Sequence, residues 1–99
     1  MYEITFMKTI RTVLETAVTE CTIREYKPEY IFRQFNTKLS NIRTQIDQAD
    51  MNKKQKAKYY KVLDGAKLPY LKANHYELMK VDFKSRINSL PGMIQFIKK

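Results

Sequence analysis

The chain has 99 residues and a net charge of +9, and a chain of this length folds as one domain around a single core. Residues 1–50 hold seven Lys or Arg and seven Asp or Glu, whereas residues 51–99 hold twelve Lys or Arg and three acids. Apolar residues make up 43% of the chain, which excludes a disordered tail. We therefore expect a single domain, 1–99, in which a neutral helical scaffold (1–50) shares its core with a basic half (51–99).

The first element is predicted to be a helix over residues 6–25, because its apolar residues recur at the spacing of a broad buried face. The opposite side carries threonines at helical spacing, although solvated helix faces usually favour long charged side chains. This uncharged stripe is either a weakly exposed face or a contact surface for a partner or a second copy. A homodimer would use Thr9, Thr12, Thr16 and Thr19.

Pro28 predicts a second helix over residues 28–49, since proline suits the first helical position and disfavours helix at the residue before it. The apolar residues of this helix are separated by three and four positions, which predicts packing along a nearly antiparallel helix of the same chain in preference to a dimeric coiled coil. They are Phe32, Phe35, Leu39, Ile42 and Ile46.

A third helix is predicted over residues 51–63, with Asp50 as its N-cap and Asp64-Gly65 as its end. At 100° per residue, four lysines of this helix fall within an arc of about 140°, opposite its apolar side. They are Lys53, Lys54, Lys58 and Lys61.

The last third of the chain favours a fourth helix over residues 74–90, capped by Asn74, and then a break at Pro91-Gly92 before a docked apolar tail. The predicted fold class is all-α, a small four-helix bundle-like domain. Alternating residues keep open an α+β fold with strands near 2–6 and 76–83. The expected core includes Ile10, Leu14, Val18, Phe32, Phe35, Leu39, Ile42, Ile46, Leu63 and Phe83.

Residues that could carry catalysis are scarce in this sequence. The chain has one histidine, His75, and one cysteine, Cys21, which falls on an apolar stripe and is predicted to fill the core. Its two glycines cannot form a phosphate-binding loop, and the acids of the basic half are scattered. We therefore expect no catalytic residue, no metal and no cofactor, and a protein that is not an enzyme.

Localisation follows from what the sequence lacks. The apolar segments are shorter than the roughly 20 residues of a membrane span, so no membrane partner is expected. Met1-Tyr2-Glu3 lacks the cationic and apolar stretches of a secretion signal, and a single cysteine forms no intramolecular disulfide. These features predict a cytoplasmic protein.

Clustered lysines favour a polyanionic partner, because each neutralised phosphate releases condensed counterions. We expect nucleic acid to bind Lys53, Lys54, Lys58 and Lys61, and tyrosines interleaved with lysines slightly favour RNA over DNA. The expected extension of this site is Lys67, Lys72, Lys80, Lys84 and Arg86, with Tyr60 and Tyr76 stacking on bases. The competing interpretation is that the lysines only solubilise the domain.

Two other functions stay open. A compact basic protein could be a virus-encoded inhibitor of a host protein or defence enzyme, steered by its charge to an acidic protein partner and using the threonine stripe as the specific contact. Scattered residues also give a family resemblance: residues 2–6, 55–58, 68–70 and 76–78, with Arg86 and residues 96–99, resemble small RelE/HigB-type toxin ribonucleases. That resemblance implies ribonuclease activity and a fold that closes with consecutive strands.

Overall fold

The computed structural model describes residues 2–68 and 75–98, with side chains from residue 5 onward, and these residues form five helices. The helices are α1 (Tyr2–Ile23), α2 (Pro28–Gln48), α3 (Lys53–Ala66), α4 (Tyr76–Asn88) and α5 (Leu90–Lys98). The predicted all-α class is confirmed. The alternative strands near 2–6 and 76–83 are wrong, because both segments are helical and continue the 3.6-residue apolar period of α1 and α4. The consecutive closing strands that the toxin resemblance implies are absent from the described residues.

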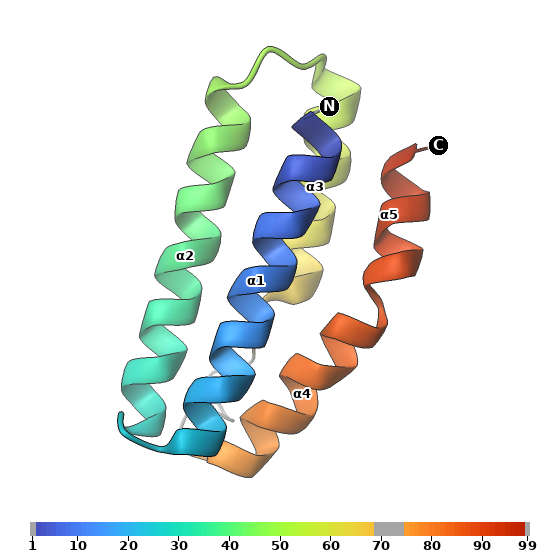
Figure 1. Ribbon diagram of the computed structural model, residues 1–99. Helices are drawn as coiled ribbons and strands as arrows, with labels where there is room; N and C mark the ends of the chain where they lie inside the picture. Colours follow the sequence, from blue (N-terminus) through green and yellow to red (C-terminus); the bar gives the residue numbers. More distant parts are fainter. Residues whose placement is uncertain (1, 69–74, 99) are drawn as a thin grey trace.

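The helices form an elongated bundle of 39 × 23 × 21 Å in which α1 is the central element. Figure 1 shows α1 and α2 running antiparallel side by side, α3 behind α1, and α4 crossing the lower end before α5 turns back toward the upper end. Both ends of the chain lie at the upper end of the bundle. The neutral scaffold and the basic half therefore share one core, with α1 packed against α2, α4 and α5.

The core contains the apolar stripes that the sequence predicted, and nine of the ten expected core residues are buried. Val18 is the exception: it is half-buried and packs against the edge of the cluster. Cys21 is fully buried, as its stripe predicted. Tyr59, which follows Lys58 on α3, is also fully buried and packs its ring edge-on against Phe6 at 5.6 Å between centroids.

The α1–α2 turn is fixed by a backbone conformation and by contacts to α4. Arg24, directly after α1, adopts a left-handed φ of 61° while its N–H still donates to the Glu20 carbonyl at 2.9 Å. Its guanidinium forms an ion pair with Glu77 of α4 at 2.6 Å, and the Tyr76 hydroxyl donates to the Tyr26 carbonyl at 2.5 Å. Pro28 opens α2, as predicted.

Helix α3 is shifted toward the C-terminus relative to its predicted range. Its N-cap is Asn52, whose side-chain oxygen accepts from the Gln55 N–H at 2.8 Å, so the prediction of Asp50 as the cap is wrong. The helix also passes through Asp64 and Gly65 and ends at Ala66. Gly65 keeps a negative φ, so the predicted left-handed stop does not occur there.

The C-terminal tail is a helix rather than an apolar extension beyond a break. Helix α4 ends at Asn88, and α5 begins at Leu90, with the Ser89 carbonyl accepting from the Met93 N–H at 3.1 Å. Pro91 falls in the first turn of α5, where its missing N–H costs no helical hydrogen bond. The predicted break at Pro91-Gly92 is wrong, because both residues lie within α5; the chain instead kinks between α4 and α5 (Figure 1). The predicted cap Asn74 lies outside the described residues, and α4 follows His75.

Candidate nucleic-acid interface

Four lysines lie on the solvent side of α3, and we call Lys53, Lys54, Lys58 and Lys61 the lysine face. All are exposed except Lys58, which is half-buried. The opposite side of the helix buries Tyr59, Val62, Leu63 and Ala66. Burial of that side fixes the rotation of the helix, so the lysines are held outward by core packing.

No ion pair neutralises the lysine face among the residues that the structure describes. Lys61 instead lies over the Phe96 ring of α5, with its ammonium 5.7 Å from the ring centroid. The fifth lysine of the helix, Lys56, points elsewhere and donates to the Asp47 backbone carbonyl at 2.7 Å. The lysine face is therefore a cationic surface available to an external anion.

The other lysines that were predicted to extend the lysine face lie in different surroundings. Lys67 lies 3.4 Å from the Asp64 carboxylate, and Lys80 lies 3.5 Å from Glu77. Each of these cations therefore already has an acid beside it. Lys84 is exposed on α4. Lys72 lies outside the described residues.

The Arg86 guanidinium donates to backbone carbonyls of α3 and α4 and of the residue after α3. Its Nε and Nη2 donate to the carbonyls of Ala66 and Lys67 at 3.0 and 2.9 Å, and Nη1 donates to the Asp82 carbonyl at 3.0 Å. The guanidinium thus satisfies carbonyls at the C-terminus of α3, where a cation also interacts favourably with the helix dipole. Arg86 therefore joins α4 to α3, and its predicted contact with phosphate stays a prediction.

The two tyrosines predicted to stack on bases already have cationic neighbours. The Tyr60 hydroxyl donates to the Asp47 carboxylate, and the Arg43 guanidinium lies 4.2 Å from the ring centroid. The Tyr76 ring has the Arg24 guanidinium at 5.0 Å, and its hydroxyl is bound to the Tyr26 carbonyl. Both tyrosines therefore contribute to joining helices, and base stacking by either ring stays a prediction.

The fold changes the pKa of Glu77 and that of Cys21. The pKa of Glu77 is lowered, mainly by the hydrogen bond from Arg24 and then by the charge of Lys80. Burial raises the pKa of the Cys21 thiol to about 11, so this thiol is protonated at neutral pH. A protonated, buried thiol is a poor nucleophile and a poor metal ligand.

Residues 2–68 and 75–98 contain neither a metal-ligating cluster nor a membrane-spanning helix. These residues contain no cluster of three His, Cys, Asp or Glu that could hold a metal ion. None of their helices combines the length and the hydropathy of a membrane span.

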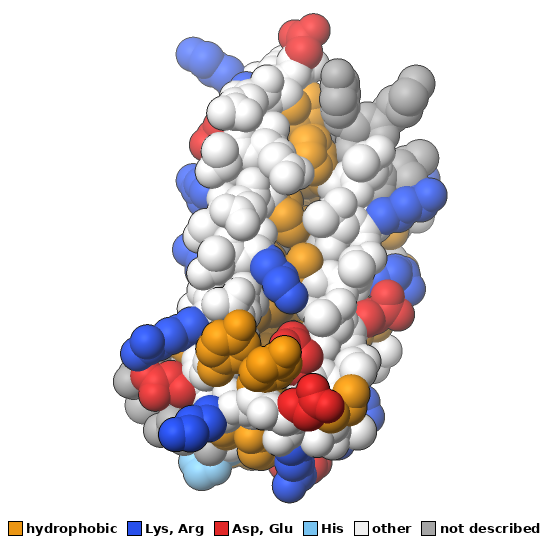
Figure 2. Space-filling model, turned by 60° about the vertical axis from the view of Figure 1, so that its left-hand side comes forward, with side chains coloured by type: hydrophobic (Ala, Val, Ile, Leu, Met, Phe, Trp, Pro, Cys, Tyr) orange, Lys and Arg blue, Asp and Glu red, His pale blue; other side chains and the backbone are white. Residues whose placement is uncertain are grey.

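The threonine stripe on α1 lies on a side of the bundle with little charge. The hydroxyls of Thr9, Thr12 and Thr19 donate to carbonyls four residues earlier at 3.0 to 3.1 Å. On the side where α2 and α1 lie, white surface of uncharged polar side chains and backbone predominates in Figure 2, with an apolar seam along its length. We call this side the neutral face. It ends near the exposed stacked pair of Tyr26 and Tyr30, whose ring centroids are 4.9 Å apart.

Comparisons with protein-family models, with curated proteins and with solved structures found no match to this chain.

Proposed function

We propose that the protein binds nucleic acid without catalysis, through the phosphate backbone and the lysine face of α3. The observation that carries this proposal is the segregation of charge: four lysines project from one helix with no acidic partner in the described ranges, whereas Lys67 and Lys80 have carboxylates beside them. Clustered, unpaired ammonium groups bind polyphosphates because their binding releases counterions.

The size of the lysine face suits a phosphate backbone. Lys53 and Lys61 are eight residues apart, which is about 12 Å along the helix axis. Over that length duplex DNA presents about seven phosphate charges, so each lysine has a phosphate within reach. The contacts of Tyr60 and Tyr76 remove the reason for preferring RNA, and we propose binding to DNA or RNA without base-specific contacts.

The proposal is tested by fluorescence anisotropy with a labelled 20-base-pair DNA duplex, the matching RNA duplex and a single strand, across a series of salt concentrations. If four lysines contact phosphates, the slope of log affinity against log salt is about −4 for duplex DNA and about −3 for single strands. A slope near zero would rule out phosphate binding as the source of affinity.

Charge-reversal variants locate the surface. Lys54→Glu, Lys58→Glu and Lys61→Glu together are expected to abolish binding, because all three side chains lie opposite the buried side of α3. The matched control is Lys27→Glu, Arg33→Glu and Lys38→Glu, which changes the net charge equally on the α2 side. Equal losses in the two triple variants would show that total charge, not the lysine face, determines binding. Circular dichroism measures the helix content of both variants, which is expected to equal that of the wild type.

A second candidate function, binding to an acidic protein or to a second copy of the chain, is favoured by the exposed apolar residues at one end of the neutral face. Tyr26 and Tyr30 are each 46% exposed, and Ile23 is 58% exposed. Aromatic side chains of this kind are enriched at protein interfaces. Sedimentation equilibrium of the wild type and of the Thr12→Arg, Thr16→Arg variant tests the dimer. A monomer at all concentrations would exclude it.

A further inference from the structure

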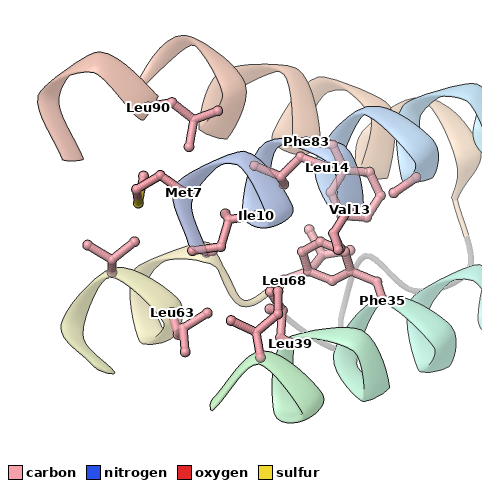
Figure 3. Close-up of a cluster of buried hydrophobic side chains, with 14 of the residues drawn as sticks. Met7, Ile10, Val13, Leu14, Phe35, Leu39, Leu63, Leu68, Phe83 and Leu90 are labelled. Carbon is pink, nitrogen blue, oxygen red and sulfur yellow. The ribbon is translucent and has the colours of Figure 1, made fainter. Parts of the chain in front are cut away.

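An apolar cavity of about 350 Å³ lies between α1 and α5. Its walls are Met7 of α1 and Leu90, Ile94 and Ile97 of α5, and its rim carries Lys8, Arg11 and Lys98. Figure 3 shows Leu90 reaching toward α1 in the region where Met7 lies. Three of the wall residues are buried, whereas the three cations are exposed. The cavity thus has an aliphatic interior and a cationic rim.

The rim cations have no acidic partner among the described residues, since no ion pair involves Lys8, Arg11 or Lys98. Arg11 and Lys8 belong to the half of the chain that is neutral in sequence, so the charge asymmetry gave no indication of them. The fold brings them close to Lys98 by packing α5 against α1. Three positive charges at one opening attract an anionic group.

The chemistry of the walls selects the kind of anion. The wall side chains are apolar, and apart from the weakly accepting Met7 sulfur they lack groups that could hydrogen-bond the edge of a nucleobase or sugar. The cavity volume lies near the lower end of the range for small-molecule pockets, about 300 to 1,000 Å³, so it suits one alkyl chain and not the two chains of a phospholipid. We infer that this cavity binds a single-chain fatty acid, with its alkyl chain against Met7, Ile94 and Ile97 and its carboxylate at Lys8, Arg11 and Lys98.

Binding is measured with dodecanoate below its micellar concentration, by calorimetry and by NMR of the methionine methyl groups. Met7 lines the cavity, whereas Met93 faces the opposite side of α5 toward α3, so the two methyls distinguish the site. We expect one molecule to bind per chain, with a saturable shift of the Met7 methyl signal and little change at Met93. Equal shifts of both signals, or no saturation, would overturn the inference.

Two variants separate the apolar and the cationic parts of the site. Ile94→Trp places a large ring in the cavity and is expected to abolish binding, whereas Gln95→Trp, on the exposed side of the same helix, is expected to leave it unchanged. Arg11→Glu with Lys98→Glu is expected to weaken binding by at least about tenfold. Its charge-matched control, Lys27→Glu with Arg33→Glu, is expected to bind as the wild type does. Unchanged affinity in both cavity variants would contradict the assignment.

The head group and the source of the ligand are tested separately. Dodecyltrimethylammonium has the same chain and the opposite charge, so it is expected to bind at least about tenfold more weakly than dodecanoate. Anionic phosphatidylglycerol vesicles are expected not to shift the Met7 signal, because two-chain lipids do not fit. Comparable binding of the cationic amphiphile, or a Met7 shift with vesicles alone, would overturn the single-chain fatty acid as the ligand.

Discussion

The Nε atom of Arg86 on α4 donates a 3.0 Å hydrogen bond to the carbonyl oxygen of Ala66, the last residue of α3. A second nitrogen of the same guanidinium binds the next carbonyl, that of Lys67. One side chain therefore fixes the C-terminus of α3, which carries the lysine face, to the helix that follows it. The position of the lysine face therefore depends on a cation of α4 that donates to backbone carbonyls.

Replacing this side chain tests its structural role. Arg86→Ala is expected to lower the free energy of unfolding by about 2 to 3 kcal/mol, because three hydrogen bonds from a charged donor are lost. Lys84→Ala, an exposed cation two residues away, is expected to change it by less than about 0.5 kcal/mol. Urea denaturation measures both values. If Arg86→Ala lost nucleic-acid affinity at full helicity with no loss of stability, a phosphate contact would replace this interpretation.

The buried seam between α2 and α4 is tested at Phe35. Its ring is 2% exposed and lies 4.7 Å from the Phe83 ring, between centroids. Phe35→Ala is expected to cost about 3 to 5 kcal/mol of unfolding free energy, because it leaves a cavity in the centre of the bundle. Tyr30→Ala, on the exposed side of the same helix, is expected to cost about 1 kcal/mol or less. Similar costs for the two variants in thermal or urea unfolding would contradict the burial of this seam.

The start of α3 gives a direct comparison between the sequence prediction and the structure. Asn52→Ala removes the oxygen that accepts from the Gln55 N–H and is expected to cost about 1 kcal/mol. Asp50→Ala removes the cap that the sequence predicted and is expected to change stability by less than about 0.5 kcal/mol. Urea unfolding of both variants decides between the two residues, and the opposite ranking would restore Asp50 as the cap.

The apolar stripes of α1 and α2 could be predicted because a 3.6-residue period determines which side of a helix is buried, whatever it packs against. The N-cap of α3 could not be predicted, because both Asp and Asn cap helices. Whether Asp50 or Asn52 takes this position depends on where α2 ends. Arg86 reaches carbonyls 19 and 20 residues away in the chain, so its role depends on how α3 and α4 pack.

Two adjacent tyrosines of the candidate site also have contacts that the sequence alone could not predict. Tyr59 and Tyr60 have identical side chains next to the same lysines, yet one is in the core and the other binds Asp47 of α2. Helical periodicity separated their faces but could not supply the partner on α2. The cationic rim at Lys8 and Arg11 could not be predicted from the sequence either, because it forms only when α5 packs beside α1.

The ion pair between Arg24 and Glu77 makes stability depend on pH in a defined direction. Because the fold lowers the pKa of Glu77 from its ordinary value of 4.5, the unfolded chain takes up a proton at this site before the folded protein does. The stabilisation is therefore present above pH 4.5 and is lost as the pH falls through the lower pKa of the folded state. Both side chains are exposed, so salt also weakens this contribution.

Glu77→Gln is therefore expected to be less stable than the wild type at pH 7, and the difference is expected to shrink steadily as the pH is lowered below 4.5. Urea unfolding from pH 7 to pH 3 at low salt measures the difference. Glu15→Gln, an exposed acid on α1 without an ion pair in the described residues, is the control and is expected to show a smaller pH dependence. A difference between wild type and Glu77→Gln that stays constant across this range would show that the carboxylate charge contributes nothing and that the Gln side chain alters packing instead.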